Sequence, residues 1–119
     1  MHSSTVLDHF KNPRNGGELP GATASVDVSN PVCGDILRLA ARVESGCIAE
    51  IRFKCQGCVV SLASASALTE LVAGQSLSEA RRVTAADVSA HLGGLPQASF
   101  HGAQLAADAL ATLLSKLPA

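Results

Sequence analysis

Four side chains in this sequence are of types that bind metal ions or carry sulfur chemistry: Cys33, Asp35, Cys58 and His101. Two thiolates, a carboxylate and an imidazole form a ligand set that suits tetrahedral zinc or an iron–sulfur cluster. Their sequence spacing alone does not bring them together, so the chain must fold with the ends of several elements at one place.

Cys33 and Asp35 flank a glycine in the stretch NPVCGD, residues 30–35. Pro31 and Gly34 favour a tight loop, and the glycine lets the backbone fold close enough for both flanking side chains to reach one ion. The alternative is a hairpin turn that carries an incidental cysteine.

Cys58 lies where a strand pattern changes to a helix pattern. Apolar and polar residues alternate over 51–56, Gly57 interrupts the alternation, and a helical pattern then runs to the stop signal at Gly74. A thiol at a helix start is favoured as thiolate by unpaired N–H groups and the helix dipole. His101 is expected at or just before the start of the last helix, where a cap or surface role is the alternative.

The remaining elements predict an α+β fold, with helices packed against a three-stranded antiparallel sheet. Strands are expected at residues 23–30, 35–43 and 48–55, joined as a meander before the central helix. Thr5 with Asp8, Ser76 with Glu79, and Thr84 with Asp87 are expected capping pairs, and the last helix is expected at residues 102–116. His91 is expected on an exposed turn, as a surface residue rather than a ligand.

Composition excludes several classes of function. By length, residues 1–119 are expected to form one domain, and nine basic against ten acidic side chains indicate no nucleic-acid footprint. No apolar run approaches the roughly 20 residues that span a bilayer, and the N-terminal residues do not resemble a signal peptide. We therefore expect a cytoplasmic protein, without nucleic-acid or membrane partners, whose four cysteines are thiols or metal ligands.

Four segments in order resemble the IscU/NifU N-terminal family of iron–sulfur cluster assembly scaffolds, over nearly the whole chain. They are VLDHFKNPRN (6–15), NPVCGD (30–35), FKCQGCVVSLASASALTELVAGQS (53–76) and LPQASFHGAQLAADAL (95–110). The resemblance implies a small antiparallel sheet with helices packed on it. It also implies a scaffold, not an enzyme, that receives sulfur from a cysteine desulfurase and builds a [2Fe–2S] cluster with iron. Such proteins pass the cluster to recipient apo-proteins and often hold zinc at the same site.

By position, the resemblance assigns Cys33 and Cys58 as cluster cysteines, Asp35 as the residue that tunes cluster release, and His101 as the neighbouring histidine. The third cysteine of the family is replaced by Gly102, which can neither ligate a metal nor accept sulfur. The family's LPPVK segment, read by a dedicated Hsp70 chaperone, is replaced by residues 95–99, LPQAS, which argues against recognition by that chaperone.

Two cysteines and the function itself leave alternatives open. Cys55 is either a core residue or an auxiliary thiol near the site, and Cys47 is expected to be a half-buried apolar residue. The favoured function is a scaffold or carrier for iron or a [2Fe–2S] cluster, as a monomer or weak homo-oligomer. The first alternative is a regulatory paralogue with zinc on the same four ligands; a thiol–disulfide redox module using Cys55 and Cys58 is the weakest.

Overall fold

A computed structural model describes residues 2–30 and 34–117 of the chain. It contains one sheet of three antiparallel strands in the order β1-β2-β3, formed by Ala24–Ser29, Ile36–Glu44 and Cys47–Gln56. The helices are α1 (Ser4–Lys11), α2 (Val59–Val72), α3 (Leu77–Ala80), α4 (Ala85–His91) and α5 (Phe100–Ser115), and a 3-10 turn, η1 (Gln97–Ser99), precedes α5. The α+β fold and the meander expected from the sequence are confirmed.

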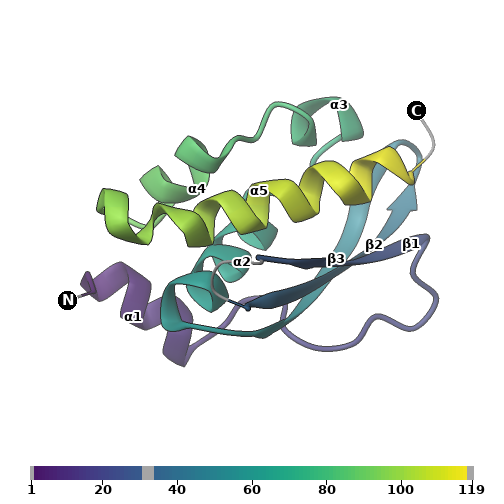
Figure 1. The fold of residues 1–119 in the computed structure, drawn as a ribbon. Coiled ribbons are helices and arrows are strands. Elements are labelled where there is room, and N and C mark those ends of the chain that lie inside the picture. The colour runs from purple at the N-terminus through teal and green to yellow at the C-terminus, as the bar shows by residue number, and fades with distance from the viewer. Residues whose placement is uncertain (1, 31–33, 118–119) are drawn as a thin grey trace.

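One face of the sheet carries the helices. Helices α2 and α5 lie side by side over it, α1 packs on α2, and α4 packs on α5 and α2 (Figure 1). On the other face, outward side chains form ion pairs, among them Arg38 with Asp27 and Lys54 with Glu18. The sheet is thus apolar on the helix side and charged on the other, as the alternation in its strands predicts.

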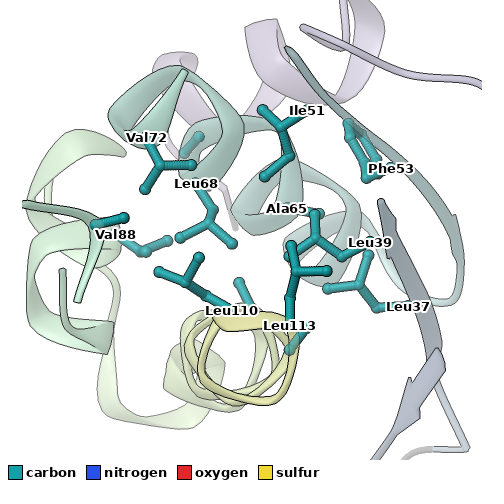
Figure 2. Packing of buried hydrophobic residues seen from close by; sticks show 14 of the residues in the cluster. Leu37, Leu39, Ile51, Phe53, Ala65, Leu68, Val72, Val88, Leu110 and Leu113 are labelled. Carbon is teal, nitrogen blue, oxygen red and sulfur yellow. The ribbon is translucent and has the colours of Figure 1, made fainter. Parts of the chain in front are cut away.

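Helix α2 is the centre of the core. Ten of its fourteen residues are buried, because it contacts the sheet on one side and the helices α1, α4 and α5 on others. Figure 2 shows side chains from the strands, α2, α4 and α5 meeting around it. The largest fully buried apolar side chains are Leu37, Leu39, Ile48, Ile51, Leu68, Leu92, Leu110, Leu113, Val6, Val72 and Val88.

Local signals explain most helix boundaries. Ser76 and Thr84 each form a capping box, with Glu79 and Asp87, so these two expected pairs are confirmed. The expected pair at the first helix is wrong: Ser3 is the N-cap of α1, and its hydroxyl accepts from the Val6 N–H. Thr5 instead lies inside the first turn, because the helix starts two residues earlier than that pair required.

The edge of β3 is covered at two points. The Phe53 N–H donates to the Asn15 carbonyl, and the Gly17 N–H donates to the Phe53 carbonyl. Near the other end of the strand, Cys47 forms an isolated antiparallel β-bridge with Ser76. The loop that follows α1 therefore completes part of the sheet edge, which would otherwise expose unpaired backbone groups.

Candidate metal centre

Sheet register and helix start together place the first two ligands. Ile36 pairs with Gln56 in the β2–β3 ladder, so Asp35 and Gly57, one position further along, face each other at the end of the sheet. Cys58 follows at once as the N-cap of α2. The chain thus turns from β3 into α2 directly beside the Asp35 carboxylate.

Asp35 is buried and held by α2. The Ser61 hydroxyl donates to Asp35 Oδ2 over 2.5 Å, and the Cys58 thiol lies 3.4 Å from the same oxygen. A Cβ on Gly57 would come within 2.5 Å of Asp35 Cγ. The absence of a side chain at Gly57 therefore makes the space that the carboxylate occupies.

Cys58 is exposed, and its side chain makes no cap hydrogen bond. Its sulfur lies 3.3 Å from Ser61 Oγ and 3.6 Å from His101 Nε2. As expected from the sequence, the thiol lies at the start of the central helix, where unpaired backbone N–H groups favour an anion.

His101 is in the first turn of α5 and is half-buried. Its Nδ1 lies 3.2 Å from the Ala98 carbonyl, which can only accept a hydrogen bond, so the proton is on Nδ1. Nε2 is then the ring nitrogen that faces the Cys58 sulfur and would bind a metal ion. A carbonyl that fixes the tautomer in this way is typical of histidines that bind metals.

The three ligand atoms are spaced as a metal ion would need. All lie within 4.8 Å of one another. A tetrahedral zinc ion with ordinary bond lengths separates a sulfur ligand from a nitrogen or oxygen ligand by about 3.5 Å. The observed distances from the Cys58 sulfur, 3.4 Å to Asp35 and 3.6 Å to His101, agree with this separation.

Cys33, the fourth expected ligand, lies outside the described residues. The backbone on both sides of it is closed by two hydrogen bonds: the Asn30 N–H donates to the Asp35 carbonyl and the Gly34 N–H to the Asn30 carbonyl. Gly34 has φ of 72°, a conformation that favours glycine. The glycine next to Asp35 thus lies in a turn, and its expected role of bringing Cys33 and Asp35 to one ion stays a prediction.

Cys55 lies near the site but not among its three gathered ligands. It is on the helix side of β3, half-buried against the core. Burial, with smaller contributions from the Asp35 and Cys58 charges, raises the pKa of the Cys55 thiol to about 11. Both open interpretations of Cys55 therefore keep a structural basis, although its thiol is protonated at neutral pH.

Gly102 is buried, and the space beside its Cα is filled. A Cβ there would come within 2.6 Å of Val60 Cγ1 and 3.0 Å of the Val60 backbone carbonyl. Gly102, where the resemblance leads one to expect a third cysteine, thus permits close packing of α5 on the first turn of α2.

Sequence reasoning missed Ser61, the partner of the Asp35 carboxylate, and the packing role of Val60. A signal for Ser61 existed, since it follows Cys58 by three residues and such residues share one helix face. Val60 gave no comparable signal, because its contact with Gly102 joins two helices that are far apart in the sequence.

Comparison with known proteins agrees with this architecture. The family model described as "NifU-like N terminal domain" matches residues 1–119. The iron–sulfur cluster assembly scaffold protein IscU 1 of Archaeoglobus fulgidus is 42% identical over 110 residues, covering 92% of this chain and 72% of that protein. The corresponding scaffold protein IscU of Aquifex aeolicus is 39% identical over 111 residues, covering 92% and 71%.

Solved structures show the same fold. A putative iron–sulfur cluster assembly scaffold protein for the SUF system from Fervidobacterium islandicum superposes with a TM-score of 0.78 at 20% identity, covering 95% of this chain and 96% of that one. Among the described residues, no helix is long and apolar enough to cross a membrane. The family expected from the sequence is confirmed: this chain belongs to the NifU-like N-terminal domain family.

Proposed function

We propose that this chain is a scaffold or carrier that assembles an iron–sulfur cluster on Cys33, Asp35, Cys58 and His101. The observation that carries the proposal is the meeting of the Asp35, Cys58 and His101 ligand atoms within 4.8 Å at the junction of the sheet with α2 and α5. Relatives of about 40% identity that are named as such scaffolds support it.

The cluster is cargo, built from iron and from sulfur that a cysteine desulfurase supplies, and then passed to recipient apo-proteins. Two thiolates on one iron and the mixed carboxylate and imidazole on the other make a more labile cluster than four thiolates do. Lability suits a protein that must release what it assembles.

Among the cysteines that the structure describes, Cys58 is the thiol best suited to accept sulfur. It is exposed at a helix start, whereas Cys55 is half-buried with a pKa of about 11. In the transfer, the Cys58 thiolate attacks the terminal sulfur of the desulfurase persulfide. A new S–S bond forms on Cys58, and the desulfurase leaves as a thiolate.

The second candidate is a regulatory zinc protein that uses the same four ligands. The near-tetrahedral distances from the Cys58 sulfur and the filled space at Gly102 favour it, because zinc needs no third cysteine. The two candidates differ in the metal that the isolated protein contains and in whether the protein builds a cluster when iron and sulfur are supplied.

Anaerobic reconstitution with iron, cysteine and a desulfurase separates them, with metal analysis of the untreated protein alongside. If the chain is a scaffold, it should bind one [2Fe–2S] cluster per chain, detected by its visible absorption. Cys58→Ala and His101→Ala should abolish or weaken that absorption. Cys47→Ala is the control, since Cys47 is a half-buried cysteine at the opposite end of β3 from Cys58. Stoichiometric zinc, no cluster and no stimulation of the desulfurase would establish the second candidate instead.

Asp35→Ala tests the role of the carboxylate in release. Its Oδ2 lies 3.4 Å from the Cys58 sulfur, close enough to compete with that thiolate for an iron. We expect a longer cluster lifetime in this variant, measured as the decay of the visible absorption of the cluster when an iron chelator is added. An unchanged or shorter lifetime contradicts this role.

A further inference from the structure

A second group of metal-ligating side chains lies near the other end of α2. His9 of α1, Glu70 of α2 and His91, the last residue of α4, place one ligand atom each within 4.8 Å of the others. Glu70 is twelve residues after Cys58, which corresponds to about 18 Å along a helix. The group is therefore separate from the site at Asp35, Cys58 and His101.

The same carboxylate oxygen of Glu70 lies close to both imidazole rings. Glu70 Oε1 lies 3.3 Å from His9 Nε2 and 2.9 Å from His91 Nε2. Nitrogen and oxygen ligands of a tetrahedral zinc ion are about 3.3 Å apart, as bond lengths of about 2.0–2.1 Å require. A small outward movement of the exposed His91 would thus admit an ion between the three atoms.

The other atoms of these ligands are held by neighbours. His9 Nδ1 lies 2.8 Å from Ser66 Oγ, which can accept the ring proton when Nε2 turns its lone pair to a metal. Glu70 Oε2 lies 3.5 Å from Arg14 Nε, so the guanidinium takes the oxygen that the ion does not need. Arg14 is itself paired with Asp8 over 2.7 Å, which offsets its positive charge near a bound cation.

Burial differs among the ligands in a way that suits binding. His9 is only 3% exposed, and burial, followed by the charge of Arg14, lowers its pKa. The side chains of Glu70 and His91 are about one-third exposed, which leaves an ion a path from solvent.

We propose that His9, Glu70 and His91 form a second divalent-cation site, of the zinc class, which ties α1 and α4 to the central helix. Two imidazoles and one carboxylate, with a water molecule in the fourth position, form a ligand set that zinc commonly takes. The competing explanation is a hydrogen-bonded cluster in which both Nε2–H groups donate to Glu70. That explanation predicts no metal affinity.

The experiment is a titration of the full chain with zinc against a chromophoric chelator. The parent is Cys33→Ala/Cys58→Ala, which lacks the thiol ligands of the first site. We expect one zinc per chain, and His91→Ala should weaken binding by more than the about 10- to 100-fold that loss of a supporting partner costs. His91 is exposed at a helix end, so its removal should leave the fold intact, and His2→Ala, at another exposed histidine, is the matched control.

Cobalt gives an independent readout in the chain with all cysteines present. Bound at His9, Glu70 and His91, it should add visible bands without a sulfur-to-metal charge-transfer band, and His91→Ala should remove them. Zinc content should fall by one ion per chain in His91→Ala, whatever happens at the cysteines. Equal zinc affinity in His91→Ala and its parent, or no zinc bound to the Cys33→Ala/Cys58→Ala parent, overturns the proposal.

Discussion

At the scale of single residues, two glycines decide what the site can hold. Gly57 leaves room for the Asp35 carboxylate, and Gly102 lets α5 approach the first turn of α2. The sequence singled out Gly57 only as a break between strand and helix, and Gly102 only as a missing ligand. Their packing roles could not be predicted, because each depends on a contact with a residue distant in the chain.

Gly57→Ala should push the Asp35 carboxylate out of its position. The new Cβ would lie 2.5 Å from Asp35 Cγ, and Ser61 and Cys58 hold that side chain in place. We expect a loss of about 1–3 kcal/mol in the free energy of unfolding, as for other overpacked sites, together with weaker metal binding. Gly16→Ala is the matched control, since its Cβ would meet nothing nearer than 3.9 Å. Urea denaturation of the two variants measures the difference, and equal stability contradicts the account.

Gly102→Cys, which places a cysteine where the resemblance leads one to expect the third cluster cysteine, should destabilise the fold. The Cβ would clash with Val60, in both its side chain and its backbone, at a cost of about 1–3 kcal/mol. Gly102→Ala adds the same Cβ without a thiol, so both variants should lose similar stability in thermal melts. A Gly102→Cys variant as stable as the parent would show that α5 can move away from α2 freely.

Cys55 should alkylate slowly in the folded protein. With a pKa of about 11 rather than the ordinary 9.0, its thiolate fraction at pH 8 is about 100-fold lower. Peptide mapping after iodoacetamide treatment should show the rate rising towards pH 11 in the folded chain, but levelling near pH 9 in guanidinium. Equally fast alkylation of Cys55 in both states would mean that the thiol is accessible and ionised, as an auxiliary sulfur acceptor requires.

At the scale of elements, the boundaries followed from signals that are local in the sequence. The strands expected at 23–30, 35–43 and 48–55 are Ala24–Ser29, Ile36–Glu44 and Cys47–Gln56, because alternation and turn residues fix them. The start of α5 was expected at residue 102 but is Phe100, after the 3-10 turn at Gln97–Ser99. The true start of α5 could not be predicted, because no side chain caps the helix and the sequence therefore carries no capping signal there.

Helix α2 carries buried polar side chains whose effects should differ. Ser64 Oγ is buried and has no hydrogen-bond partner among the described residues, whereas Ser66 Oγ accepts from the Arg14 N–H and contacts His9 Nδ1. Ser64→Ala should therefore raise the free energy of unfolding by about 1 kcal/mol, and Ser66→Ala should lower it by about 1–3 kcal/mol. Chemical denaturation of both variants checks the sign of each change. Destabilisation by Ser64→Ala would indicate a partner for its hydroxyl.

At the scale of the whole molecule, the helix that begins at Cys58 organises both the core and the candidate site. The sequence indicated a helix that runs from Cys58 to the stop signal at Gly74 and follows the three-stranded meander. It could not indicate that the same helix also joins His9, Glu70 and His91, because these residues come from three separate elements. His91 was expected to be a plain surface residue; it is exposed, but it contacts Glu70.

Leu68→Ala tests whether α2 is the centre of the fold. Leu68 is fully buried among strands and helices (Figure 2), so truncation should cost about 2–5 kcal/mol of unfolding free energy. Leu7→Ala makes the same chemical change on α1, where the side chain is 37% exposed, and should cost less than about 0.5 kcal/mol. Similar losses in thermal denaturation of the two variants would contradict the packing described.

The central claim is that a cluster forms on mixed ligands without a third cysteine. The most direct measurement is the Mössbauer spectrum of protein reconstituted anaerobically with ⁵⁷Fe and a desulfurase. The account predicts two ferric doublets of equal area, one from an iron with two thiolates and one from an iron held by Asp35 and His101, and a change of only the second doublet in His101→Ala. A single doublet from two equivalent thiolate-bound irons, or iron that does not enter a cluster at all, would contradict it.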